Sequence, residues 1–173
     1  HLPFVINPFD AIALEEAIRI GEQADSVEVL AVGIGTAFYE TELRTALAMG
    51  ADRALLVEVE EYDDARGGLD PWNVACLLRE IVQREHPDLV LMGKQAVDDD
   101  AGQVPQFLAA LLDWPQATFA STVEIHPEGL RVARETDSGI ETIAISLPAV
   151  ISTDLRLNEP RYASLPSILK SRK

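Results

Sequence analysis

Helix-like patterns and short apolar runs alternate over the first two thirds of the chain, and this alternation restricts the fold most. The run Asp88–Gly93 (DLVLMG) is typical of a strand buried on both faces, and Val27–Gly33 (VEVLAVG) is similar. We expect helices over residues 7–21, 36–50, 71–86 and 102–112, and strands over 27–33, 54–59 and 88–93. Such alternation predicts an α/β fold with an open, mostly parallel sheet and helices on both faces.

Capping residues predict where these helices begin. Asn7, followed by a proline, is the expected cap of the first helix, and Thr36 is the expected cap of the second. An acidic, glycine-containing stretch over residues 60–70 is typical of an exposed loop. Pro71 then opens the third helix.

The last third of the chain has a different rhythm. Segments 118–125, 130–136 and 141–147 are rich in Val, Ile and Thr and are separated by glycine-containing turns, which predicts antiparallel hairpins. A last strand is expected over 149–153. We therefore expect one α/β domain over residues 1–153, followed by a segment, 154–173, without clean periodicity.

Charge and composition exclude several classes of protein. The 173 residues include 14 basic and 29 acidic side chains, a net charge of −15, which disfavours nucleic acid as the main partner. The body, residues 1–153, carries −18, whereas residues 154–173 carry +3. A single cysteine, Cys76, excludes an internal disulfide framework or a cysteine cluster for a metal. No apolar run approaches the roughly 20 residues of a membrane-spanning helix.

Two loops follow predicted strands, where parallel α/β sheets bind ligands. The first, Gly33–Thr36, is either a ligand-binding turn or a plain connection, because a single GxG is a weak signal. The second, Gly93–Gln103, contains a lysine that could neutralise an anion and Asp100 as the expected cap of the next helix. Its three adjacent aspartates are equally typical of a solvated acidic turn.

Catalytic motifs are missing from the sequence. It contains neither GxSxG nor HExxH, and Cys76 has no partner for nucleophilic chemistry and is expected in the core. We therefore expect a protein that is not an enzyme in its own right. The tail mixes Tyr, Leu and Arg, a composition found in interaction anchors. An arm packed on its own domain is the equally open alternative.

Several strings together resemble the β subunit of electron-transfer flavoprotein. They are NPFD with the AIALEEAIR that follows, RTALAMGADRA, DLVLMGKQAVDDD, DWPQATFAS and DLRLNEPRYASLP. They run in order over nearly the whole chain. The resemblance implies an adenine-nucleotide α-hydrolase-like α/β fold and a heterodimer with an α subunit. It also implies electron transfer from acyl-CoA and other flavin dehydrogenases to a membrane quinone oxidoreductase, as in fatty acid β-oxidation.

The resemblance also implies cofactors and sites. The β subunit would bind AMP as a structural group, while the α subunit holds most of the FAD. AMP contacts are implied at Asn7, Pro8, Phe9, Asp10, Ile34, Gly93, Lys94, Gln95, Ala96, Val97, Asp98, Asp99, Asp100, Ala101, Gly102, Gln103 and Val104. Dehydrogenase docking is implied at Arg161, Tyr162, Leu165, Pro166, Ile168, Leu169 and Lys170, with Leu165 as the anchor. Arg134 and Glu135 match a pair near the interface with the flavin domain.

The resemblance leaves two alternatives and one expectation about the ends. Family members usually have a further N-terminal segment and an arm that would follow residue 173, so we expect a fragment or a partly ordered chain. Ile34 stands where a cysteine is common in the family. The alternatives are a bifurcating type with a second FAD in place of AMP, and a stand-alone AMP or ATP sensor. A bacterial cytoplasm or a mitochondrial matrix is the expected location.

Overall fold

The computed structural model describes residues 5–24, 26–59 and 69–171, which form two compact units. Unit 1 contains residues 5–6, 14–24, 26–59 and 160–171, and unit 2 contains residues 7–13 and 69–159. Most of the loop expected over 60–70 lies outside the described residues. The division of the sequence into a nucleotide-binding domain, residues 1–153, and a partner-recognition tail, residues 154–173, stays a prediction.

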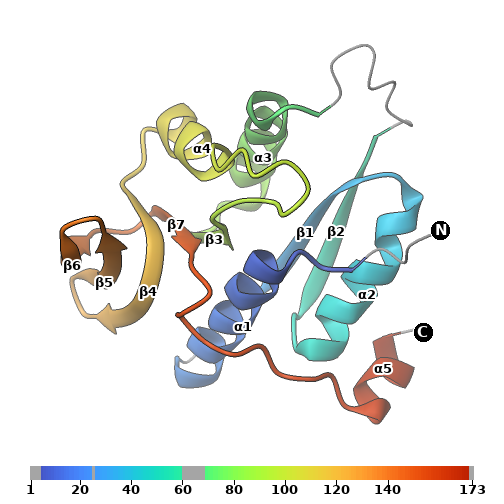
Figure 1. Cartoon of the computed structure of the whole chain (residues 1–173). Coiled ribbons are helices and arrows are strands. Elements are labelled where there is room, and N and C mark those ends of the chain that lie inside the picture. The colour runs from blue at the N-terminus through green and yellow to red at the C-terminus, as the bar shows by residue number, and fades with distance from the viewer. Residues whose placement is uncertain (1–4, 25, 60–68, 172–173) are drawn as a thin grey trace. The chain divides into compact units, whose positions relative to one another are not determined.

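Unit 1 contains a parallel strand pair with a helix connecting the strands (Figure 1). Its elements are most of α1 (Pro8–Gln23), β1 (Leu30–Gly35), the 3-10 turn η1 (Ala37–Tyr39), α2 (Glu40–Met49), β2 (Arg53–Glu58) and α5 (Leu165–Ser171). Strands β1 and β2 pair in register from Leu30 opposite Arg53 to Gly35 opposite Glu58. Helix α2 ends where the sequence predicts, because Gly50 adopts a φ of 137° that other residues avoid.

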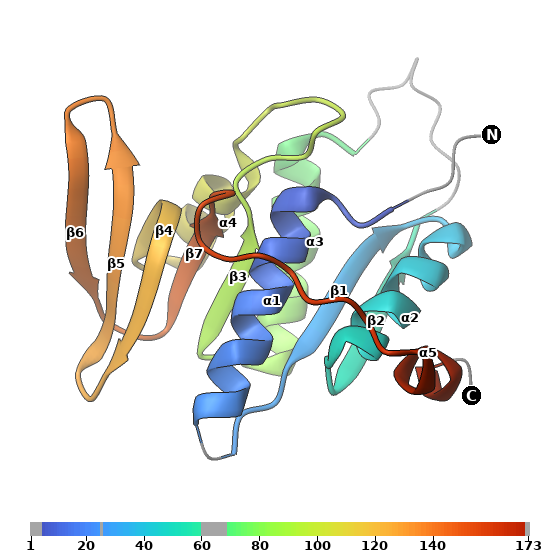
Figure 2. The ribbon, with the colours of Figure 1, turned by 60° about the horizontal axis from the view of Figure 1, so that its bottom comes forward.

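Unit 2 is built on a five-stranded mixed sheet in the order β3-β7-β4-β5-β6 (Figure 2). Its elements are α3 (Pro71–Glu85), β3 (Leu89–Gly93), α4 (Val104–Leu112), β4 (Gln116–His126), β5 (Gly129–Thr136), β6 (Gly139–Ile145) and β7 (Ala149–Thr153). Strands β3, β7 and β4 are parallel, and β4, β5 and β6 form the expected antiparallel hairpins. The α/β fold class is therefore confirmed, with the parallel pairs distributed over two sheets.

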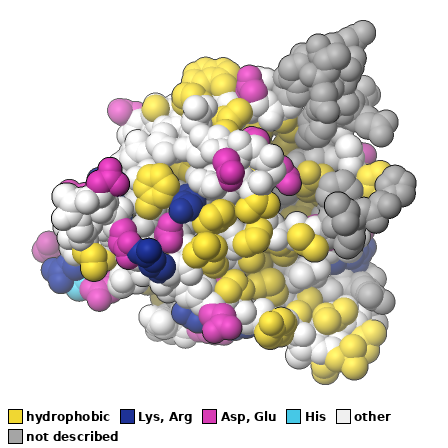
Figure 3. All heavy atoms as spheres, viewed as in Figure 1, with side chains coloured by type: hydrophobic (Ala, Val, Ile, Leu, Met, Phe, Trp, Pro, Cys, Tyr) yellow, Lys and Arg dark blue, Asp and Glu magenta, His cyan; other side chains and the backbone are white. Residues whose placement is uncertain are grey.

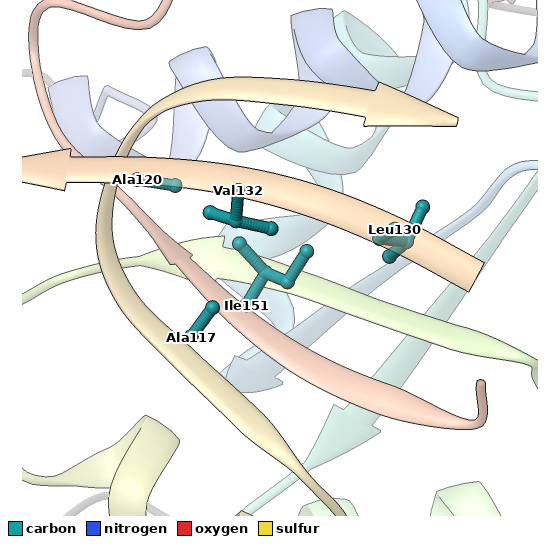
Figure 4. Close-up of a cluster of buried hydrophobic side chains, with 5 residues drawn as sticks. All are labelled: Ala117, Ala120, Leu130, Val132 and Ile151. Carbon is teal, nitrogen blue, oxygen red and sulfur yellow. The ribbon is translucent and has the colours of Figure 1, made fainter. Parts of the chain in front are cut away.

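Strand β7 is buried over its whole length because both faces of the sheet are covered around it. Ile151 points to one face, where it packs with Ala117, Leu130 and Val132 (Figure 4). Its neighbour Val150 points to the other face and packs against α3 and α4. A continuous apolar run in the sequence is the expected signature of such a strand.

Two local expectations are wrong. Thr36 does not cap a helix through its side chain, because the chain first makes the turn η1 and α2 begins only at Glu40. The tail contains a helix, α5, where no helical pattern is visible in the sequence. A seven-residue segment is too short for a 3.6-residue periodicity to be recognised. Among the described helices, none has the length and apolarity needed to cross a membrane.

Helix α3 offers a direct test of capping. The Asp70 Oδ1 atom accepts a hydrogen bond of 2.7 Å from the Asn73 backbone N–H. We expect Asp70→Ala to lower the free energy of unfolding by about 1 kcal/mol, because this helix donor loses its partner. Thr36→Ala removes no such bond and should leave the free energy of unfolding unchanged. Urea unfolding followed by circular dichroism measures both, and equal losses would contradict the assignment.

Candidate functional site

The start of α1 and the loop after β3 are joined by hydrogen bonds within unit 2. The Gly93 N–H donates to Asp10 Oδ1 at 2.6 Å. The Asn7 amide nitrogen donates to the Gln95 carbonyl at 2.8 Å, and its Oδ1 accepts from the Val97 N–H at 3.3 Å. Asn7 therefore uses its side chain on the loop. The structure brings together two segments of the expected nucleotide site that are more than 80 residues apart in sequence.

Close packing at Gly93 holds this arrangement. A Cβ atom on Gly93 would lie 2.7 Å from the Phe9 Cβ and 2.9 Å from the Asp10 backbone nitrogen. The Thr153 hydroxyl, at the end of β7, donates to the Phe9 carbonyl at 2.9 Å. Solvent reaches one side of Asp10. The surrounding protein nevertheless desolvates its carboxyl, and this raises the pKa of Asp10. Hydrogen bonds from Asn7 and Gly93 lower the pKa but do not outweigh the desolvation.

Lys94 lies among aromatic rings and an acid at the same edge of the sheet. Its Nζ is 2.7 Å from Asp154 Oδ2, 5.0 Å from the centre of the Phe9 ring and 5.6 Å from that of Phe119. The ammonium is thus paired with an acid of its own chain, and its expected contact with the nucleotide stays a prediction.

Phe119 and Asp154 are members of this cluster that sequence reasoning missed. Phe119 has a φ of 58°, is 38% exposed, and lies where β4 is irregularly paired with β7. A bulky residue in this conformation is uncommon and is often found at functional sites. The strand pattern of the sequence contains no signal for such an irregularity.

The acidic loop has internal partners. Asp99 Oδ1 accepts from the Ala101 N–H at 3.0 Å, and Asp100 Oδ1 accepts from the Gln95 amide at 2.6 Å. The expectation that Asp100 caps α4 is wrong, because α4 begins only after Gln103 and Asp100 has a φ of 51°. The Gln103 side chain makes no capping bond. Because Pro105 has no N–H, the first turn of α4 offers the N–H groups of Val104 and Gln106 to an anion from outside the helix.

The remaining expected flavin-interface residues lie on β5. Arg134 Nε is 2.7 Å from Glu141 Oε2, and its NH1 group donates to the Thr118 hydroxyl at 3.0 Å. Glu135 forms an ion pair with Arg156, and both side chains are exposed. The structure thus places this pair on the β4–β5 hairpin. Arg134 is opposite Ala120, next to the register shift between Ala120 and Thr122.

Ile34 belongs to unit 1, unlike the rest of the expected nucleotide site. It pairs with Val57 near the end of β1 and is half-buried. A Cβ atom on the following residue, Gly35, would lie 2.6 Å from the Tyr39 ring. The end of β1 is therefore tightly packed against the 3-10 turn η1.

The expected docking residues lie in the tail of unit 1. Tyr162 is 98% exposed, Leu165 70% and Leu169 56%. Hydrophobic side chains gather over α5 in Figure 3. Pro166 and Lys170 are also exposed, and Ile168 is half-buried. Arg161 differs, since its guanidinium is bound to Glu15 and Glu22 of α1.

Among the side chains that the structure describes, no group of His, Cys, Asp and Glu could hold a metal ion. Cys76 is a free, half-buried thiol within α3.

Comparison with known proteins places these features in context. The model of the electron transfer flavoprotein domain matches residues 1–173. The chain is 52% identical over 168 residues to an electron transfer flavoprotein subunit beta of Dictyostelium discoideum, and equally to that of Homo sapiens. The corresponding protein of Bradyrhizobium diazoefficiens is 50% identical. Each match covers 97% of this chain, which spans 65% of the length of these relatives.

Proposed function

Because the chain belongs to the electron transfer flavoprotein family, as a relative of its beta subunits, we propose that it works within a heterodimer with an α subunit. The observation that carries this proposal is a match along all 173 residues, with about half of the positions identical to beta subunits from three distant organisms. Its role is to carry electrons between flavin dehydrogenases and a quinone oxidoreductase of the respiratory chain, without catalysing a reaction of its own.

A structural AMP is the nucleotide that we propose for the edge of the sheet in unit 2. The residues there fit an adenine nucleotide. Helix α4 lacks a side-chain cap, so its N–H groups suit the phosphate. Asn7 and Asp10 hold the loop in place through Gln95 and Gly93. Since Asp99 and Asp100 accept hydrogen bonds within the loop, the charges of these two side chains need not face the phosphate.

The flavin is proposed to be held mainly by the α subunit, next to β5 of this chain. Arg134 and Glu135 are exposed or half-buried there and could contact a partner without unfolding the hairpin. FAD supplies the redox chemistry when it is bound. This chain contributes a rigid surface, since Arg134 is already fixed by Glu141 and Thr118.

Docking of acyl-CoA and other flavin dehydrogenases is proposed at residues 162–170. Exposed Tyr162, Leu165 and Leu169 provide apolar contacts. The net charge of +3 over residues 154–173 would favour an acidic partner surface.

The nucleotide content of the purified heterodimer tests the proposal. We expect denaturation of the chain co-produced with an α subunit to release AMP and FAD in equal amounts, as measured by mass spectrometry. Asn7→Ala should lower the AMP content severalfold, because the loop loses both bonds to the Asn7 side chain. Asn73→Ala is the matched control and should retain AMP, since only its backbone caps α3.

Three outcomes would contradict the proposal. Two FAD for each heterodimer and no AMP would indicate the bifurcating type. A chain that binds ATP and does not associate with an α subunit would indicate the stand-alone sensor. AMP retained by Asn7→Ala at the level of the control would exclude this loop as the site.

A further inference from the structure

The exposed apolar residues of the tail belong to a segment with little stability of its own. The docking segment, defined here as residues 162–170, includes most of α5, a helix of seven residues. An isolated helix of this length does not persist in water. The Ser164 hydroxyl accepts from the Ser167 N–H at 3.3 Å, which caps only its first turn. Other contacts must hold the helix in one conformation.

The first contact is at the beginning of the segment, where Arg161 is bound to α1. Its Nε is 2.8 Å from Glu15 Oε2, and its backbone N–H donates to the same oxygen at 3.1 Å. Its NH1 and NH2 groups donate to the two carboxylate oxygens of Glu22 at 2.5 and 3.0 Å. The Glu15 side chain is only 3% exposed, whereas that of Glu22 is 56% exposed, so the attachment is buried at Glu15 alone.

The second contact is at the end of the segment, on α2. The Arg44 NH1 group donates to the Ser171 carbonyl at 2.7 Å. Arg44 is itself oriented by Glu40, which accepts from its Nε at 3.0 Å and from its NH2 group at 2.6 Å. A cation on the last carbonyls stabilises a helix C-terminus.

The two arginines therefore fix the ends of a segment whose middle is exposed. Each acts on the backbone or on a buried carboxylate, and each leaves Leu165 and Leu169 facing solvent. A segment already ordered in this way loses less conformational entropy when a partner binds it.

We propose that Arg161 and Arg44 are positioning residues, which hold the docking segment in its binding conformation so that Leu165 is presented to a dehydrogenase. This inference rests on the proposed docking function and adds the means by which the segment is ordered. Arg161 serves docking through α1 instead of contacting the partner.

Arg44→Ala tests the inference with little risk to folding, because its partner Glu40 is 60% exposed. In the heterodimer reduced by an acyl-CoA dehydrogenase, we expect KM for the flavoprotein to rise about fivefold with kcat unchanged. Amide hydrogen exchange over residues 162–171 should accelerate. Arg79→Ala is the matched control: it removes the same charge from an exposed pair with Glu80 and should change neither quantity.

A double-mutant cycle separates positioning from a direct contact of Arg44 with the partner. Leu165→Ala alone should raise KM, because the variant loses the apolar side chain that the partner would bury. In the Leu165→Ala background, Arg44→Ala should raise KM less than twofold, since there is little left to position. A fivefold rise in both backgrounds would overturn the inference, because Arg44 would then contribute by its own charge.

The remaining outcomes distinguish the inference from the function on which it rests. An unchanged KM in Leu165→Ala would refute docking by this segment. If Leu165→Ala raises KM and Arg44→Ala does not, docking stands and only the positioning role of Arg44 is refuted. Faster exchange without any change in KM would also refute positioning.

Discussion

Gly93→Ala is expected to lower the stability of unit 2 by about 3 kcal/mol, the largest single effect that we expect near the candidate site. The added methyl group would lie 2.7 Å from the Phe9 Cβ and 2.9 Å from both the Asp10 nitrogen and its Oδ1 atom. Relieving this overlap must separate β3 from the start of α1. The 2.6 Å hydrogen bond from the Gly93 N–H to Asp10 would weaken at the same time.

Urea unfolding followed by tryptophan fluorescence measures this effect, since Trp72 and Trp114 both belong to unit 2. Gly21→Ala, within helix α1, is the control, and its unfolding is monitored by circular dichroism. The new Cβ atom would lie an ordinary 3.5 Å from Val29 Cγ2. It should be neutral or stabilising by up to about 1 kcal/mol. A Gly93→Ala variant as stable as the wild type would show that Phe9 and Asp10 do not pack on β3 as described.

Arg161→Ala is expected to lower the stability of unit 1 by about 3 kcal/mol. The variant leaves the Glu15 carboxylate, with a side chain only 3% exposed, with Arg19 as its remaining ion-pair partner. Circular dichroism during urea unfolding reports the loss. Arg79→Ala, at an exposed pair, should cost less than about 0.5 kcal/mol. Equal midpoints for the two variants would contradict a structural role of Arg161.

The pH dependence of this loss provides an independent check. Burial raises the pKa of Glu15, but hydrogen bonds from Arg161 and Arg19 outweigh it and the pKa lies below the ordinary 4.5. A carboxyl whose pKa is lower in the folded than in the unfolded protein stabilises the fold at any pH above its unfolded-state pKa. This stabilisation is lost as the pH falls through the folded-state pKa. The difference in unfolding free energy between the wild type and Arg161→Ala should therefore have its full size at pH 7 and shrink below about pH 4.5. A difference that stays constant down to pH 3 would exclude Glu15 as the source.

Helix and strand positions were predictable because they depend on nearby residues. The run Asp88–Gly93 gave β3 almost to the residue, and Pro71 marked the first residue of α3. The loops after β1 and β3 could be recognised as candidate sites because parallel sheets bind ligands at these strand ends. The helix α5 could not, since so short a helix depends on Arg44 and the segment before it.

The sequence by itself determined the α/β class, the hairpins of the last third, the candidate site residues through family resemblance, and the family. Only the tertiary structure decided which partners the charged residues have. Lys94 meets Asp154 across 60 positions, and Arg161 meets Glu15 across 146. Local patterns record the periodicity of an element, whereas a contact between distant residues depends on how complete elements pack. For that reason Arg161, which the sequence suggests as a contact for a partner protein, is found bound within its own chain.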